Sequence, residues 1–264
     1  MIKLFIGLFF LGSSCAGYAE IRTASSLEPI RREIAESPKE TLVLLDVGGT
    51  LLTYPGAVLH PSHDAWRYEW FHTHHPNLSK EEKISLDRIV LATLGAWQLL
   101  DAGWPEVVIE AQDHGVKVVA FTKVALDPSI SASRADMLRR IGIPFKDDLP
   151  ELSRGNSYEY SQGVIETECR LKGPVLEEIL SSLTMRPEKI VFVDDRVNQI
   201  KSVDDACRDL EIPCVAFHYV PEATAPTLDE KIADYQFSTL VHERRWVFDG
   251  EARLELEQRE ISGS

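Results

Sequence analysis

An aspartate, a threonine, a lysine and an acidic pair, far apart along the chain, are of the types that serve in phosphoryl-transfer chemistry. They are Asp46, Thr122, Lys172 and the pair Asp194 and Asp195. A phosphoryl group carries negative charge, which Mg²⁺ held by a few oxygen ligands can neutralise. An aspartate can attack the phosphorus, while lysine, hydroxyl and backbone N–H groups hold the phosphoryl oxygens. These residue types predict one site for a divalent cation and a phosphoryl group, provided that the fold brings them together.

Four short apolar runs determine where these residues would lie. The runs cover residues 41–45, 116–121, 190–193 and 214–217. Unbroken runs of this length, separated by helical patterns, are typical of parallel strands that are buried on both faces. Asp46, Thr122 and Asp194 each follow the end of a run, and in open α/β sheets ligands bind at the carboxyl ends of the strands. The alternation of strands and helices therefore predicts a doubly wound α/β fold in which these residues share one crevice.

Composition and periodicity divide the rest of the chain. The stretch between the first two apolar runs is rich in aromatic residues and longer than one crossover helix needs, so we expect an inserted helical cap there. The expected divisions are a linker or short helix at 20–40, a core at 41–221 with the cap at about 56–110, and a helical extension with a polar tail at 222–264.

The four segments, taken in order, resemble the motifs of the haloacid dehalogenase-like (HAD) hydrolase superfamily. The matching stretches are 44–51, 119–122, 172–173 and 191–195, and the resemblance covers about residues 41–220. Residues 172–173 and 192–196 also look like those of an uncharacterised exported bacterial branch. The resemblance implies a Rossmann-like parallel sheet with a small helical cap inserted after the first strand. It also implies a Mg²⁺-dependent phosphohydrolase that acts on a small phosphorylated molecule.

The resemblance and the residue types together assign a nucleophile and a metal site. We expect Asp46 to attack the phosphoryl group and to form an aspartyl-phosphate that water later hydrolyses. We expect Mg²⁺ to be held by Asp46, Asp195 and the backbone carbonyl of Gly48. Asp194 is the alternative to Asp195 as a ligand.

A second set of residues is expected to bind the phosphoryl oxygens. Lys172 would screen charge between Asp46 and these oxygens. The Thr122 hydroxyl and the backbone N–H groups of Gly49 and Thr50 would hold the oxygens in place. Among the neighbours of the acidic pair, Asn198 and Gln199 are expected to orient Asp195, and Arg196 either to reach the phosphate or to pair with an acid.

One position departs from the pattern of the superfamily. Most of its phosphatases carry a second aspartate two positions after the nucleophile, which protonates the leaving group, and here that position is Gly48. Losing a general acid typically costs about 10²–10⁴ in rate. The chain could act on substrates with good leaving groups, or another group could supply the proton, with His60 and His63 as candidates by position. The alternative function is a weak or inactive relative that binds a phosphorylated ligand or a protein.

The first nineteen residues have the three-part layout of a secretory signal. A short basic start precedes an apolar run at 4–11 and small residues that end at Ala19. We expect cleavage after Ala19, export to the periplasm or the medium, and no stable membrane span in the mature chain. A lipoprotein signal through Cys15 or a retained N-terminal helix is the alternative.

Cysteine and histidine residues outside the motifs leave further possibilities open. After the signal the chain has Cys169, Cys207 and Cys214, of which the last two are near enough in sequence to form a disulfide; three buried thiols are the alternative. The histidines at 72, 74 and 75 could bind a transition metal, but no acidic or thiol partner completes the set, so a solvated turn of the cap is favoured.

The charge balance disfavours a nucleic-acid partner. The chain has 28 basic and 42 acidic residues, a formal net charge of −14, and no local basic patch. Such an acidic surface repels phosphodiester backbones.

With 264 residues, of which 44% are apolar, the chain is long enough for one substantial core and a small accessory domain. The sequence leaves the substrate and the oligomeric state undetermined.

Overall fold

The computed structural model describes residues 19–54, 56–91, 93, 98–124, 128–168, 170–221 and 226–262. The expected signal peptide lies outside the described residues except for Ala19, and so does Cys169. Cys207 and Cys214 are buried free thiols in the structure, with no disulfide between them.

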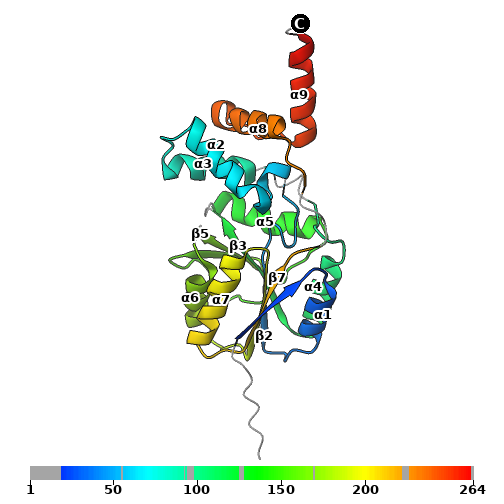
Figure 1. Ribbon diagram of the computed structural model, residues 1–264. Coiled ribbons are helices and arrows are strands. Elements are labelled where there is room, and N and C mark those ends of the chain that lie inside the picture. The colour runs from blue at the N-terminus through cyan, green and yellow to red at the C-terminus, as the bar shows by residue number, and fades with distance from the viewer. Residues whose placement is uncertain are drawn as a thin grey trace, which may run out of the picture.

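A seven-stranded sheet runs through the described residues in the order β1-β7-β6-β2-β3-β5-β4 (Figure 1). Neighbouring strands are parallel except for the antiparallel pair β4 and β5. The strands are β1 (Ala19–Ala24), β2 (Thr41–Leu45), β3 (Lys117–Val124), β4 (Tyr158–Ser161), β5 (Val164–Glu168), β6 (Lys189–Asp194) and β7 (Cys214–Tyr219). The four apolar runs lie in β2, β3, β6 and β7, and the predicted α/β fold is confirmed.

The sequence analysis did not predict the strands at the two edges of the sheet. β1 lies within the segment interpreted as a linker or short helix, and its sequence AEIRTA alternates apolar and polar residues. β4 and β5, with the sequences YEYS and VIETE, are equally mixed. The edge strands β1 and β4 are covered less completely than central strands, so they do not need the unbroken apolar run that identified the others. β5 lies inside the sheet, but the buried polar residues Glu166 and Thr167 interrupt its apolar pattern.

Helices cover both faces of the sheet (Figure 1). Successive residues of β2 point to opposite faces, as the period of a strand requires: Val43 and Leu45 lie in one buried apolar cluster, and Leu42 and Leu44 in the other. One face carries α1 (Glu28–Ala35), α4 (Trp104–Asp113) and α5 (Pro128–Arg140), and the other carries α6 (Lys172–Ser182) and α7 (Val197–Asp209).

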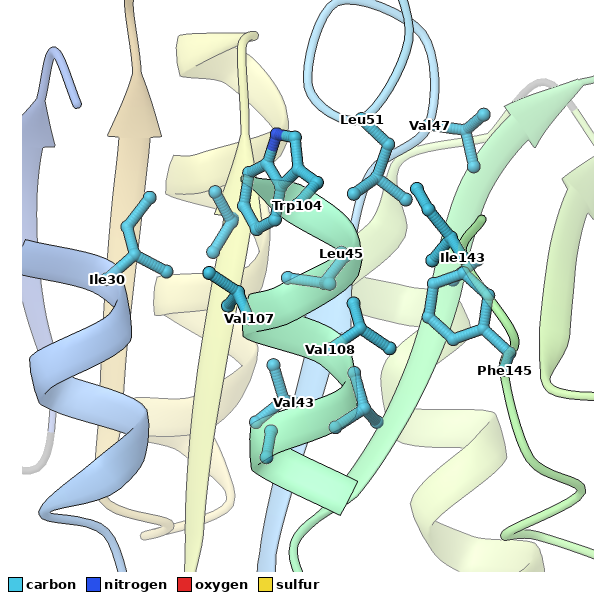
Figure 2. Packing of buried hydrophobic residues seen from close by; sticks show 14 of the residues in the cluster. Ile30, Val43, Leu45, Val47, Leu51, Trp104, Val107, Val108, Ile143 and Phe145 are labelled. Atoms are coloured by element: carbon cyan, nitrogen blue, oxygen red, sulfur yellow. The ribbon is translucent and has the colours of Figure 1, made fainter. Parts of the chain in front are cut away.

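Trp104 connects this packing to the loop after β2. Figure 2 shows its indole among Ile30, Leu45 and Leu51, between α1, α4 and the sheet. The side chain is fully buried, and its Nε1 donates a hydrogen bond of 2.8 Å to the carbonyl oxygen of Thr50. The core helix α4 thereby supports the loop that follows the expected nucleophile.

The cap is built from two segments of the chain. The inserted segment after β2 contains the short 3-10 helices η1 (Ala57–Leu59) and η2 (Pro61–His63), followed by α2 (Asp64–His74) and α3 (Lys80–Leu91). The C-terminal helix α8 (Glu230–Glu243) packs against them through Phe237 and Leu240, which share one apolar cluster with Trp70 and Leu86. Figure 1 shows α2, α3 and α8 together at one end of the molecule, with α9 (Asp249–Ser262) extending beyond them.

Three expectations about the position and extent of the cap are therefore wrong. The insertion follows the second strand of the sheet, because β1 precedes the strand that we expected to be first. Within the range 56–110, the helix α4 belongs to the core and not to the cap. The C-terminal region is no separate extension, since α8 completes the apolar core of the cap. None of the helices in the described ranges combines the length and apolar composition that crossing a membrane requires.

Candidate active site

Three adjacent parallel strands bring the predicted residues to one edge of the sheet. β6, β2 and β3 are neighbours in the sheet, with Leu45 of β2 opposite Val193 of β6 and Ala120 of β3. The backbone N–H of Asp46 continues the ladder and donates a hydrogen bond of 2.9 Å to the carbonyl oxygen of Val193. Asp46, the first residue after β2, is therefore held next to Asp194, the last residue of β6.

Lys172 joins these two aspartates. It is the first residue of α6, it is completely buried, and its Nζ lies 2.6 Å from Asp46 Oδ1 and 2.6 Å from Asp194 Oδ2. The ammonium group also lies over the rings of Phe121 and Phe192, at 5.4 and 5.3 Å from their centroids. Burial by itself would lower the pKa of Lys172, but Asp194 and Asp46 more than offset that effect, so the pKa is raised and the ammonium stays charged.

Close packing between α6 and α7 sets the position of Lys172. A Cβ atom on Gly173 would overlap with the backbone carbonyl of Ser202 in α7, so only glycine allows the two helices to approach this closely. The backbone N–H of Lys172 donates a hydrogen bond of 2.9 Å to Gln199 Oε1. Gln199 therefore positions the backbone of Lys172, whereas the sequence analysis expected it to orient Asp195.

Asp46, Asp194 and Asp195 bring more negative charge to the site than Lys172 can balance. One carboxylate oxygen from each lies within 4.8 Å of the others. Burial raises the pKa of Asp46 to about 6 despite the attraction of Lys172. Burial, together with the charges of Asp46 and Asp194, raises the pKa of Asp195 to about 8.

These carboxylates fit a divalent cation. Asp195 Oδ1 is buried and has no hydrogen-bond partner, which is costly unless a cation binds it. Asp194 has both oxygens engaged, Oδ2 with Lys172 and Oδ1 with the backbone N–H of Arg196 at 2.8 Å. Asp195 is therefore the better ligand of the two, and carboxylate and carbonyl oxygens are the donors that Mg²⁺ prefers.

A cavity of about 390 Å³ opens over these groups and reaches the cap. Nine residues that the sequence analysis named line this cavity: Asp46, Gly48, Thr122, Lys172, Asp194, Asp195, Arg196, Asn198 and Gln199. Side chains that the sequence analysis did not single out complete the lining, among them Tyr54, Asp87, Lys123 and Arg134. The structure thus gathers most of the predicted site around one small pocket.

Gly49 and Thr50 do not line this cavity, contrary to the expectation that their N–H groups bind the phosphoryl oxygens. The N–H of Gly49 donates a hydrogen bond of 2.8 Å to the carbonyl oxygen of Leu52, because the loop turns back on itself there. Thr50 is fully buried beneath the loop. Gly49 has a positive φ of 84°, and a Cβ on it would overlap with the Asp195 carboxylate, so its part is to leave space for Asp195.

Tyr54 is the main site residue that the sequence analysis missed. Its hydroxyl lies 2.9 Å from the carbonyl oxygen of Gly48 and 3.2 Å from Asp195 Oδ2, so its proton can be donated to either. Burial and the charge of Asp195 raise the pKa of Tyr54 well above its ordinary value, so the hydroxyl stays protonated. No sequence motif marks Tyr54; its contact with Gly48 exists only because the loop after β2 folds back.

His60 and His63, the candidate replacements for the missing acid, lie outside the cavity lining. The His60 ring forms a hydrogen bond of 2.7 Å with Ser62 Oγ, and His63 Nε2 forms one of 2.8 Å with the carbonyl oxygen of Pro226. Neither ring is therefore placed to protonate a leaving group in this cavity.

Side-chain contacts bear on two further alternatives. Arg196 pairs with a neighbouring acid, since its Nη1 lies 2.9 Å from Asp64 Oδ2 in the cap helix α2. His74 Nδ1 bonds to the carbonyl oxygen of Trp70 at 2.9 Å. Within the described residues, the aspartates at 46, 194 and 195 form the one group of three side chains close enough to share a metal ion, and the histidines at 72, 74 and 75 do not form such a group.

Comparison with known proteins gives a family and several distant relatives. The model of a family described as protein of unknown function (DUF2608) matches residues 23–253. A protein of Chlamydia pneumoniae is 22% identical over 249 residues, which cover 90% of this chain and 92% of that protein. Relatives from Chlamydia trachomatis serovar D (21% over 238 residues, 86% and 88% covered) and Chlamydia muridarum (22% over 227 residues, 82% and 84% covered) are similar. Each relative carries the name "Putative outer membrane protein".

Proposed function

The chain belongs to the DUF2608 family, and we propose that it is a Mg²⁺-dependent phosphohydrolase of the HAD type that acts on a small phosphorylated molecule. The observation that carries this proposal is the buried Lys172 ammonium, bonded to both Asp46 and Asp194 at the carboxyl ends of adjacent strands. A lysine is not buried between two carboxylates at a cavity without cost, and such perturbed groups gather at functional sites. The order of the HAD-like motifs supports the same assignment.

Mg²⁺ would be held by Asp46, Asp195 and the carbonyl oxygen of Gly48. The buried, unpartnered Asp195 Oδ1 supports this set of ligands. The metal would neutralise negative charge on the phosphoryl group as Asp46 approaches. Tyr54 would keep the Gly48 carbonyl in place through its hydrogen bond of 2.9 Å.

The chain's own residues would carry the two steps of hydrolysis. An Asp46 oxygen forms a bond to phosphorus while the bond from phosphorus to the leaving oxygen breaks, and water then hydrolyses the aspartyl-phosphate and releases phosphate. Lys172 keeps the Asp46 carboxylate oriented and attracts the phosphoryl oxygens. The Thr122 hydroxyl, near the carboxyl end of β3 and in the cavity lining, binds these oxygens as well.

The absence of an acid at Gly48 limits which esters the site would cleave quickly. The leaving oxygen would depart without a proton from this position, so esters of acidic alcohols and phenols are favoured. The same absence supports the alternative function, a protein that binds a phosphorylated ligand without hydrolysing it.

Hydrolysis of 4-nitrophenyl phosphate by the purified chain tests the proposal. We expect Mg²⁺-dependent turnover that EDTA abolishes, and loss of at least about 10³-fold in Asp46→Asn, because the amide is a poor nucleophile. Asp205→Asn, an exposed aspartate on α7, is the matched control and should keep full activity. Unchanged turnover in Asp46→Asn would refute the assignment of the nucleophile, and phosphate binding without any turnover would favour the alternative function.

We further propose that the chain is exported. The N-terminal sequence and the names of the chlamydial relatives support this. Cleavage after Ala19 would leave residues 20–24 of β1 still paired with β7. Expression of the full chain in a bacterium, followed by fractionation and mass spectrometry, should give a periplasmic or secreted protein that begins at Glu20. A cytoplasmic chain that retains residue 1 would contradict the proposal.

A further inference from the structure

Asp87 is a carboxylate of the cavity without a counterion. It lies on α3, it lines the same cavity as Asp46 and Lys172, and its side chain remains accessible to solvent. Among the described residues, none forms a hydrogen bond or an ion pair with it. Surrounding protein atoms raise the pKa of the Asp87 carboxyl, and the charge of Arg67 only partly offsets this. Asp87 is thus an exposed, unpaired carboxylate on the wall of the cavity.

The arginines near Asp87 and the buried Lys172 are committed to other groups. Arg67, whose charge acts on Asp87, donates hydrogen bonds to the carbonyl oxygens of Val58 and His60 and pairs with Asp64. The remaining cations of the lining lie on core elements. Their partners are Asp46 and Asp194 for Lys172, Glu166 for Arg134 and Asp64 for Arg196, while Lys123 of β3 forms no ion pair with Asp87.

The two ends of the cavity would therefore select different charges. The core end, with Lys172 and Thr122, would take the phosphoryl group. The leaving group then extends toward the cap, where Asp87 lies. A cavity of about 390 Å³ is at the small end of ligand pockets, so the leaving group is short. An unpaired carboxylate on the wall of a cavity is best complemented by a cation on the ligand.

We propose that Asp87 binds an ammonium group on the leaving-group side of the substrate, so that among phosphomonoesters of small alkyl alcohols those of amino alcohols are preferred. This inference rests on the proposed function, because it uses the phosphoryl group at Asp46 to orient the substrate. It goes beyond that function by naming the class of alcohol. Asp87 selects the substrate by charge complementarity and takes no part in the bond-breaking step.

Two esters of equal size test the proposal. 2-Aminoethyl phosphate and n-propyl phosphate differ in that an ammonium replaces a methyl group. We expect kcat/KM with Mg²⁺ to be at least about tenfold higher for the aminoethyl ester, as for one partly buried ion pair. In Asp87→Asn the ratio of the two values should fall to the small residual preference that the more acidic hydroxyl of the aminoethyl ester leaves. Glu81→Gln removes the same charge from an exposed position of α3 and should preserve the preference.

Binding measurements keep the test independent of turnover. Calorimetric titration of both esters into the Asp46→Asn variant with Mg²⁺ should show tighter binding of the aminoethyl ester. In the double variant Asp46→Asn, Asp87→Asn this difference in affinity should disappear. Equal affinity for the two esters, or a preference that survives Asp87→Asn, overturns the inference. An equal loss of rate for both esters in Asp87→Asn also overturns it, because that result indicates a proton donor. Hydrolysis of 4-nitrophenyl phosphate reports separately on the proposed function, so the two failures are distinguishable.

Discussion

Lys172 is the residue on which the electrostatics of the site depend most. Its ammonium is fully buried and lies 2.6 Å from each of two carboxylates. Pairs of this kind contribute little when compared with apolar replacements, but removing one partner leaves uncompensated buried charge. The identity of the residue at position 172 therefore affects folding as well as the proposed catalysis.

Lys172→Met should lower the free energy of unfolding by about 3 kcal/mol at neutral pH, since Asp46 and Asp194 lose their shared cation. Urea denaturation followed by circular dichroism measures the change. Lys201→Met, at an exposed position of α7, is the control and should change stability by less than about 0.5 kcal/mol. A Lys172→Met variant as stable as the native chain would contradict the buried ion pairs.

At the scale of elements, the contact between α6 and α7 sets the geometry of the site. Gly173 follows Lys172 directly and faces the backbone of Ser202, where no side chain fits. The sequence identified the Lys172-Gly173 pair as part of a motif, but it gave no physical reason for the glycine. The reason is the distance between two helices, which no local pattern encodes.

Gly173→Ala should destabilise the chain by about 1–3 kcal/mol, because the added methyl group forces α6 away from α7. The shift also moves Lys172, so the rate with 4-nitrophenyl phosphate should fall at least about tenfold. Gly250→Ala is the matched control: nothing lies within 4 Å of its Cβ position in α9, and alanine favours a helix there. Thermal unfolding and rate measurements on both variants would decide; equal effects would refute the close-contact argument.

The sequence predicted some of the strands and helices and missed others. The four central strands were predicted because each is buried on both faces and must be apolar throughout. β1 and β4 were missed because strands at an edge need no such run, and β5 because the buried Glu166 and Thr167 interrupt its apolar pattern. α8 was assigned to an extension because its packing partners, Trp70 and Leu86, are about 150 residues away along the chain. Strands that a few consecutive residues identify were predictable, and the packing of α8 against helices distant in the sequence was not.

At the scale of the whole molecule, the acidic site couples folding to pH. The pKa of Asp195 rises from an ordinary value of 3.8 to about 8 in the folded chain, chiefly through burial. The folded state therefore binds this proton more tightly than the unfolded state does. The stabilisation is complete below pH 4 and is lost as the pH rises through 8. A cation at the site would reverse the trend, since it favours the ionised carboxylate.

In EDTA, the melting temperature of the native chain should fall by more than about 3 °C between pH 6 and pH 8.5. Addition of Mg²⁺ should raise it more at pH 8.5 than at pH 6, because the metal competes with the proton of Asp195. Asp195→Asn should reduce both the pH dependence and the response to Mg²⁺. Differential scanning fluorimetry measures each of these; a Mg²⁺ response equal in Asp195→Asn and in the native chain would exclude Asp195 as a ligand.

The sequence by itself determined which residue types stand at the ends of the central strands, and hence that Asp46, Thr122 and Asp194 meet at one edge of a parallel sheet. It could do so because a buried strand and its first loop residue are properties of a few consecutive residues. Only the tertiary structure placed Tyr54 against Gly48, withdrew Gly49 and Thr50 from the pocket and brought Asp87 over it. These contacts depend on how loops and helices pack across long separations in the chain, and that packing is settled by the fit of whole elements rather than by any local pattern.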